Sequence, residues 1–311
     1  PAGLHRTAAP TTVCRVPDLT SNVTDTALLF EGGGMRASYT SGVVVALLEA
    51  GLHLDWVGGI SAGSSNACNY LSRDADRARR SFTDFAADPR FGDVKTFVRG
   101  DGLFNAKYIY QEAGLPGQAL AFDWDTFSAN PAQLRIGGFN ATTAEQVHWG
   151  RDDYSHIHDL MIRVQASSTM PVLMPPVTIG GEVFVDGALG PAGGIPLDAA
   201  RADGYEKFLA VLTRERGYVK PPQGAEWFFR RHFRKLPAVA DALMARAEHY
   251  NATREELFEL ERAGRAYLFV PEQMPVGNGE RNVGKLHASH EAGLAQARRE
   301  LPAITEFLGL A

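Results

Sequence analysis

Residues 55–63 read Asp-Trp-Val-Gly-Gly-Ile-Ser-Ala-Gly, and this stretch decides the fold. The apolar run 55–59 predicts a short buried strand, and the small residues from Ala62 to Leu71 predict a helix. Ser61 therefore stands at a strand-to-helix turn, in the pattern G-x-S-x-G. Such a turn holds the serine in a strained conformation that exposes its hydroxyl. Glycine is needed at Gly59 and Gly63 because side chains there would collide.

A second strand-to-helix turn precedes the first. Residues 26–31 predict a buried strand, Gly32-Gly33-Gly34 interrupts it, and residues 38–50 have apolar positions at helical spacing. The two units together form a βαβα pattern, which predicts a parallel sheet covered by helices on both faces. Both loops leave the carboxyl ends of neighbouring parallel strands, so we expect them to converge on one crevice.

The three glycines have two interpretations. They leave backbone N–H groups unobstructed, as an oxyanion hole requires, and Arg36 adds a permanent positive charge beside them. The loop also fits the dinucleotide fingerprint as Gly32-x-Gly34-x-x-Ala37, but a dinucleotide site favours an acidic residue at the end of the following strand. That strand ends in Gly58-Gly59-Ile60-Ser61. We therefore interpret the loop as an oxyanion hole and expect no cofactor.

A serine hydroxyl becomes a nucleophile only when a base accepts its proton, and Asp186 is the candidate base. Asp186 ends a short alternating strand, residues 182–185, and is followed by Gly187 and Ala188. The sheet fixes a carboxylate at a strand end, and the following loop exposes it. Asp-Gly is also an ordinary turn dipeptide, so this assignment depends on the serine and glycine motifs.

The remaining pattern extends the sheet and adds helices. Further strands are predicted at residues 133–140 and 146–149 (a hairpin), 207–214 and 267–270. Helices are predicted at residues 77–87, 155–166, 225–235, 238–250 and 253–263 and from Ser289 onward, with a loop over 91–103. We expect an N-terminal extension, a catalytic α/β domain and a mostly helical C-terminal extension packed on it, over residues 1–25, 26–215 and 216–311.

Composition limits the function classes. The 311 residues are 45% hydrophobic and 22% charged, as in ordinary soluble globular proteins. The net charge of −5 excludes a broad basic field, so no nucleic-acid partner is expected. No apolar run is long enough to span a bilayer, and residues 1–18 contain no signal-peptide core. Only two cysteines occur, Cys14 and Cys68, which favours a reducing compartment and a cytoplasmic location.

Four motifs in this order resemble the patatin-like phospholipase family. They are Gly32-Gly33-Gly34-Met35-Arg36, Gly59-Ile60-Ser61-Ala62-Gly63, Ala166-Ser167-Ser168-Thr169-Met170-Pro171 and Asp186-Gly187-Ala188. The resemblance covers residues 26–215. It implies a three-layer α/β/α sandwich with a largely parallel central sheet, and a lipase or phospholipase A-type acyl hydrolase acting on lipid esters.

The resemblance also implies roles for individual residues. Ser61 is implied as the nucleophile and Asp186 as the base of a two-residue dyad. Gly32, Gly33 and Gly34 are implied as the oxyanion hole, assisted by Arg36. Two positions depart from the family pattern: Glu31 stands where aspartate is frequent, and Ala37 stands where glycine commonly follows the arginine. The second departure predicts a less tight turn from the loop into its helix.

Two other interpretations stay open at this point, and a third is disfavoured. A Ser–His–Asp triad of α/β-hydrolase type would take its histidine from His232, His249, His287 or His290. A non-catalytic protein that binds lipid or nucleotide could use the same fold. A metal site at His156-Ile157-His158 lacks the i, i+4 spacing that places two ligands on one helix face, so no metal is expected.

One segment near the carboxyl end suggests contact with membranes. Aromatic and basic residues alternate there: Trp227, Phe228, Phe229 and Phe233 with Arg230, Arg231, Arg234 and Lys235. Such a helix could lie at a lipid surface, or could pack its aromatic side chains on the protein core. The expected partners are a lipid or ester substrate and, peripherally, a membrane. The sequence indicates no oligomeric state.

Overall fold

Eight strands form one central sheet in the computed structural model, which describes residues 19–92 and 104–310. Their order is β5-β6-β3-β2-β1-β7-β8, with β4 paired to β3 outside this path. The strands are β1 (Ala27–Phe30), β2 (Trp56–Ile60), β3 (Gln133–Asn140), β4 (Gln146–Trp149), β5 (Val177–Ile179), β6 (Glu182–Asp186), β7 (Phe208–Val211) and β8 (Ala266–Phe269). The run β3-β2-β1-β7-β8 is parallel, whereas β4, β5 and β6 pair in antiparallel fashion. The sheet is therefore mixed.

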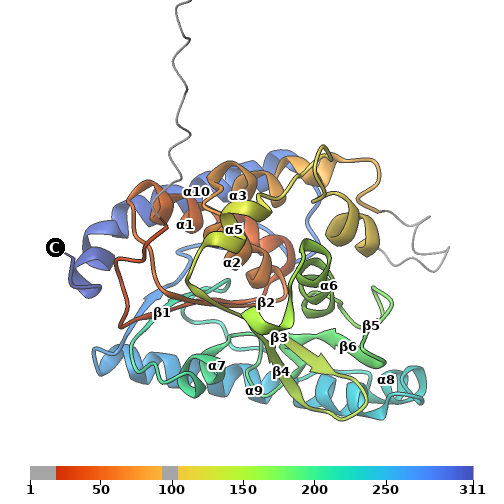
Figure 1. Ribbon diagram of the computed structural model, residues 1–311. Coiled ribbons are helices and arrows are strands. Elements are labelled where there is room, and N and C mark those ends of the chain that lie inside the picture. The colour runs from red at the N-terminus through yellow and green to blue at the C-terminus, as the bar shows by residue number, and fades with distance from the viewer. Residues whose placement is uncertain (1–18, 93–103, 311) are drawn as a thin grey trace, which may run out of the picture.

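Helices cover both faces of this sheet (Figure 1). One layer contains α1 (Ala37–Glu49), α2 (Ala62–Leu71), α3 (Ala75–Ser81), α5 (Trp124–Ala129), α6 (Ile157–Ser167) and α10 (Val283–Phe307). The other contains α7 (Leu197–Ala202), α8 (Glu226–His232) and α9 (Pro237–Arg262). Short 3-10 turns lie at Gly34–Arg36, Asp84–Ala87, Arg151–Asp153 and Gly187–Leu189, and a π-helical turn at Tyr108–Glu112. The predicted three-layer α/β/α architecture is confirmed.

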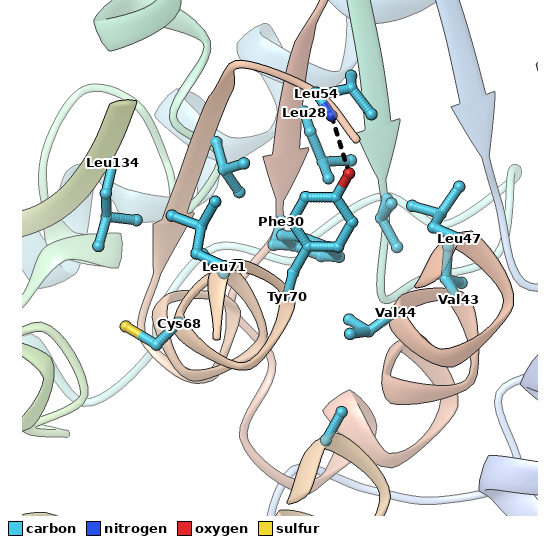
Figure 2. Packing of buried hydrophobic residues seen from close by; sticks show 14 of the residues in the cluster. Leu28, Phe30, Val43, Val44, Leu47, Leu54, Cys68, Tyr70, Leu71 and Leu134 are labelled. Atoms are coloured by element: carbon cyan, nitrogen blue, oxygen red, sulfur yellow. Dashed lines mark hydrogen bonds between the residues drawn. The ribbon is translucent and has the colours of Figure 1, made fainter. Parts of the chain in front are cut away.

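The side chains of β1 point alternately to the two faces of the sheet and are apolar on both, so both faces need a helical cover. Leu28 and Phe30 face the cluster under α1 and α2, whereas Ala27 and Leu29 face the cluster under α7 and α9. Figure 2 shows the first cluster, in which Tyr70 of α2 inserts between β1 and α1. The hydroxyl of Tyr70 donates to Leu52 O at 2.6 Å and accepts from Leu54 N–H at 2.9 Å. This side chain therefore ties α2 to the segment that leads into β2.

The C-terminal segment shares this sheet and its helical layers. β8 pairs with β7 in parallel, and α10 packs along α1. The two helices approach closely where each has a glycine: a Cβ atom on Gly42 would lie 2.3 Å from Leu294 N, and one on Gly293 would lie 2.0 Å from Tyr39 O. Ser38 Oγ also donates to Ser289 Oγ at 2.8 Å. Residues beyond 216 thus help to form the central sheet and the layer that covers it.

Several predicted elements differ from the structure. The helices predicted at 238–250 and 253–263 are one helix, α9, because the side chain of Asn251 bonds the backbone of Lys220 and the helix continues through it. α10 begins at Val283 rather than near Ser289, capped by the Asn282 side chain. β5, α5 and α7 were not predicted. Residues 1–18, with Cys14, and residues 93–103 of the predicted loop lie outside the described chain.

Candidate active site

Ser61 occupies a sharp turn between β2 and α2. Its backbone has φ +56° and ψ −130°, in the left-handed range that non-glycine residues rarely adopt. A Cβ atom on Gly59 would lie 2.3 Å from Gly63 O, and one on Gly63 would lie 2.2 Å from Phe30 O. Neither position has room for a side chain. The strain at Ser61 is therefore held by a turn that only this glycine spacing allows.

The structure brings Ser61 and Asp186 together. Ser61 Oγ donates to Asp186 Oδ2 at 2.9 Å, and Ala188 N–H donates to Asp186 Oδ1 at 2.9 Å. Gly187 must be a glycine because a Cβ atom there would lie 2.3 Å from Gly137 O. Burial raises the pKa of the Asp186 carboxyl, while the charge of Arg246 and the hydrogen bonds from Ala188 and Ser61 act in the opposite direction.

Ser167 is a supporting residue for which the sequence motifs gave no role. Its hydroxyl accepts from Ser61 N–H at 2.9 Å and donates to Gly137 O at 2.5 Å. The turn is thereby fixed to β3. Because Ser61 N–H is already bonded, it is not a free donor toward a substrate. The alanine-serine segment of residues 166–171 was the signal that could have identified this residue.

The glycine loop lies directly against the serine. A Cβ atom on Gly32 would lie 3.0 Å from Ser61 Cβ, and Gly32 N–H already donates to Gly194 O at 3.0 Å. Within residues 19–92 and 104–310, the N–H groups of Gly33 and Gly34 have no hydrogen-bond acceptor. Gly34 has φ +55°, which favours glycine. The donors that the loop leaves free are thus those of Gly33 and Gly34.

Glu31 and Arg36 flank this loop and are both buried. Glu31 accepts from Thr213 N–H at 2.6 Å and from the Tyr250 hydroxyl at 2.8 Å, so it connects β1, the end of β7 and α9. Burial lowers the pKa of Arg36, and the charge of Glu31 opposes this shift. The substitution of glutamate for the family's frequent aspartate therefore occurs at a position with a structural role.

An apolar cavity of about 110 Å³ begins at Ser61. Its lining includes the aromatic and aliphatic side chains of Phe82, Phe85, Phe122, Leu160, Met161 and Val164. Cys68 also lines it, and burial raises the pKa of that thiol to about 12, so the thiol stays protonated. The serine hydroxyl thus lies at the boundary between a polar turn and a space suited to a hydrocarbon chain.

The four histidines considered for a triad have other partners or other locations. His287 Nε2 lies 2.7 Å from Asp84 Oδ1, and His290 Nδ1 lies 2.8 Å from Ser41 Oγ. His232 stacks on Phe228 in α8, and His249 belongs to α9. None of the four is hydrogen-bonded to Ser61 or Asp186.

Neither a metal-binding group nor a membrane-spanning helix is found in the described part of the chain. Over residues 19–92 and 104–310, no group of three or more His, Cys, Asp or Glu side chains is placed to bind a metal ion. His156 instead precedes α6 and pairs with Asp159. Over the same residues, no helix has both the length and the apolar character that crossing a bilayer requires.

Comparisons with known proteins add the following. A family model for patatin-like phospholipase matches residues 28–201, and a model for a domain of unknown function (DUF6363) matches residues 236–309. Uncharacterized protein YjjU of Escherichia coli K12 is 26% identical over 214 residues, covering 66% of this chain and 55% of that protein. Uncharacterized NTE family protein Rv2565 of Mycobacterium tuberculosis is 27% identical over 306 residues, covering 90% and 47%.

More distant similarity extends to two other proteins. Lysophospholipase nte1 of Aspergillus terreus is 27% identical over 175 residues, covering 51% of this chain and 10% of that protein. The crystal structure of VipD from Legionella pneumophila aligns with a TM-score of 0.49 at 13% identity, covering 90% of this chain and 67% of that one. The chain spans about half the length of YjjU and of Rv2565, or 55% and 47%.

Proposed function

The chain belongs to the patatin-like phospholipase family, and on this premise we propose that it is a serine acyl hydrolase that cleaves ester bonds of lipids. The observation that supports the proposal most strongly is the 2.9 Å hydrogen bond from Ser61 Oγ to Asp186 Oδ2. Ser61 is the proposed nucleophile and Asp186 the proposed base. The Gly33 and Gly34 N–H groups are the proposed donors of the oxyanion hole.

The reaction proceeds in two steps. Asp186 accepts the hydroxyl proton as Ser61 Oγ attacks the ester carbonyl carbon, and the carbonyl oxygen becomes an alkoxide held by the Gly33 and Gly34 N–H groups. Each such donor is worth roughly 2.7–4 kcal/mol in the transition state. The C–O bond to the alcohol then breaks, and the alcohol leaves with the proton from Asp186. Water attacks the acyl-enzyme and loses a proton to Asp186. The bond from the acyl carbon to Ser61 Oγ then breaks, Oγ takes the proton back from Asp186, and the fatty acid is released.

The surroundings suit a carboxylate base. An ordinary aspartate is a weak base, with a pKa of about 3.9 against about 6.5 for histidine. Burial raises the pKa of Asp186 and so improves its match to a proton transfer near neutral pH. Arg36 adds positive charge beside the loop, which favours the developing alkoxide. Because none of the four candidate histidines is hydrogen-bonded to Ser61 or Asp186, the geometry favours the dyad over a Ser–His–Asp triad.

The apolar cavity supports a lipid rather than a small polar ester. Its lining of phenylalanine, leucine, methionine and valine side chains would bury an acyl chain and remove apolar surface from water. Ser61 lines the same cavity, so an acyl chain inside it would present its ester carbonyl to the hydroxyl. We assign the cavity to the acyl chain.

The protein is further proposed to be cytoplasmic and to touch membranes through α8. Each of the two interpretations of this segment fits some of its aromatic residues. Phe229 and Phe233 pack on the core with Val239 and Leu243, whereas Trp227 is 74% exposed and Phe228 is 43% exposed. Exposed aromatic side chains beside basic ones are typical of helices at an anionic lipid surface. The α8 helix would bring the hydrolase to its substrate.

Hydrolysis of matched esters tests the proposal. The purified chain is incubated with a lysophospholipid and with a monoacylglycerol of the same acyl chain, and released fatty acid is measured. We expect release by the wild type and none above background by Ser61→Ala. Ser128→Ala, at an exposed position on α5, serves as the control and should match the wild type. Release that persists in Ser61→Ala would contradict the proposal.

A further inference from the structure

Four cationic side chains gather between the glycine loop and α9. They are Arg36, Arg214, Lys220 and Arg246. Burial lowers the pKa of Lys220 to about 8, and the charge of Arg246 lowers it as well. The charge of Glu31 opposes this shift, and Arg36 and Arg214 add smaller effects that lower the pKa. The charges of the four side chains are therefore close enough to act on one another.

These cations form no close ion pairs. Over residues 19–92 and 104–310, no carboxylate forms an ion pair with any of the four. The Nε atoms of Arg36, Arg214 and Arg246 are buried, and none has a hydrogen-bond partner in that part of the chain. Buried charges in proteins are normally paired. Arg36 is buried and the other three side chains are half-buried, so an anion bound here would offset the cost of their desolvation.

The nearby acidic groups are already engaged. Both carboxylate oxygens of Glu31 accept hydrogen bonds, from Thr213 N–H and from the Tyr250 hydroxyl. Asp186 accepts from Ser61 and from Ala188 N–H. The charge of Glu31 acts on Arg36 and Lys220, and that of Asp186 interacts with Arg246, so two carboxylates offset part of the charge of four cations and an excess of positive charge remains.

Aromatic rings and backbone contacts hold two of the cations in place. Arg214 Cζ lies 4.3 Å from the ring centre of Tyr218, and Lys220 Nζ lies 4.5 Å from the ring centre of Tyr250. The backbone of Lys220 is bonded on both sides by the Asn251 side chain, at 2.8 Å and 3.0 Å. The cations are thus preorganised, which lowers the cost of ordering them around a ligand.

The cluster adjoins the reacting pair but does not line the apolar cavity. Arg246 is the cation whose charge acts on the Asp186 carboxylate, and Arg36 follows the glycine loop directly. A Cβ atom on Gly193 would lie 2.5 Å from Tyr250 Cα, and the neighbouring Gly194 O accepts from Gly32 N–H. The apolar cavity meets Ser61 from elsewhere, and none of the four cations lines it.

We propose that Arg214, Lys220 and Arg246, together with Arg36, form a subsite that binds the phosphate group of a glycerophospholipid substrate. The inference rests on the proposed function, since it places the acyl chain in the apolar cavity and the phosphate outside it, on the cationic cluster. Guanidinium and ammonium groups are the usual protein ligands of phosphate, through charge-assisted hydrogen bonds. Arg246 lies in the segment 236–309, to which this subsite gives a role in substrate selection.

Equilibrium binding to the Ser61→Ala protein tests the subsite without turnover. The probes are a lysophosphatidic acid, the monoacylglycerol with the same acyl chain, and inorganic phosphate. We expect the phosphate-bearing lipid to bind at least about tenfold more tightly than the monoacylglycerol, as charge-assisted hydrogen bonds imply. Inorganic phosphate should compete with the lysophosphatidic acid.

Variants in the same Ser61→Ala background locate the effect. Lys220→Gln and Arg246→Gln should each reduce the preference for the phosphate-bearing lipid by about tenfold, and Lys220→Arg should keep it. Arg262→Gln removes an exposed cation from α9, the helix that contains Arg246, and should also keep the preference for the phosphate-bearing lipid. Thermal melts establish that each variant is folded.

Two results would overturn the inference. One is equal affinity for the two lipids. If inorganic phosphate still binds in that case, the cluster binds free phosphate and not the phosphate group of a lipid substrate. The other is a preference that persists in both Lys220→Gln and Arg246→Gln. Failure of the hydrolase proposal is a separate result. If the wild-type protein prefers the phosphate-bearing lipid but releases no fatty acid, the subsite proposal stands and the hydrolase proposal fails.

Discussion

Ser61 Oγ lies 2.9 Å from Asp186 Oδ2, although the two residues are 125 positions apart in the chain. The strand β3 creates this relationship, because β2 and β6 pair end to end along the same edge of β3, while β4 pairs along the other edge. Ile60 is in register with Gly137, and Asp186 is in register with Gly138. Two adjacent glycines of β3 thus align the end of β2 with the end of β6, and Ser167 ties the serine turn to the same strand.

The activity should depend on pH through a single carboxylate. Because burial raises the pKa of Asp186, the base becomes protonated as the pH falls through a value above 3.8, and kcat/KM should fall with it. No second loss near pH 6.5 is expected, because no histidine takes part. Rates of ester hydrolysis between pH 3 and 9 check this. A profile with two acidic limbs would contradict a single carboxylate base.

Asp186→Asn should reduce kcat/KM by about 10²–10⁴-fold, the usual contribution of a general base. The same substitution should not impair folding. A raised pKa means that the native state binds the proton more tightly than the unfolded chain, so wild-type stability falls as pH rises from 3.8 through the native pKa. In Asp186→Asn no carboxyl group ionises at this position, so this loss of stability does not occur. The variant should therefore melt at a higher temperature than the wild type at pH 7, with a smaller difference at acidic pH.

Histidine substitutions separate the dyad from a triad. We expect His232→Gln, His249→Gln and His287→Gln to keep activity near that of the wild type, because none of these side chains is hydrogen-bonded to Ser61 or Asp186. His290 is buried and bonded to Ser41, so its substitution should lower stability while the folded fraction stays active. A triad would lose its base in one of the four variants, and activity would fall by orders of magnitude.

The residues closest to the chemistry were predictable from sequence because their constraints are local. Gly59 and Gly63 are required within one turn, and that requirement is visible in five consecutive residues. The free N–H groups were not predictable to the same degree, since Gly32 N–H is bonded to Gly194, far along the chain. The cationic cluster depends on contacts between residues 214–220 and α9, which no local pattern encodes.

Charge reversal on α8 tests membrane contact. Arg231 and Arg234 are exposed, whereas Arg230 is already paired with Glu226 and Asp241, so the double variant Arg231→Glu/Arg234→Glu removes unpaired positive charge. Binding to vesicles that contain anionic lipid should weaken by roughly fivefold or more for each charge, measured by flotation. Arg262→Glu, exposed on α9, is the matched control and should float like the wild type. Equal flotation of all three proteins would contradict the proposal that α8 contacts membranes.

Tyr70→Phe should destabilise the fold by about 1–3 kcal/mol, because it leaves Leu52 O and Leu54 N–H unpaired in the core (Figure 2). Urea unfolding measures the change. Tyr154→Phe is the matched control: Tyr154 is also buried, but its hydroxyl has no hydrogen-bond partner in the described chain, so its removal should cost little. Equal stability of the two variants would contradict the role given to Tyr70.

Labelling with a fluorophosphonate probe, followed by peptide mapping, tests the central claim most directly. The probe reacts with an activated serine hydroxyl and needs no knowledge of the lipid. We expect the label on the peptide that contains residues 59–63, at Ser61, with none in Ser61→Ala and much slower labelling in Asp186→Asn. Label on a different serine, such as Ser65 in the same cavity, or no label on the folded wild-type protein, would contradict a reactive Ser61–Asp186 pair.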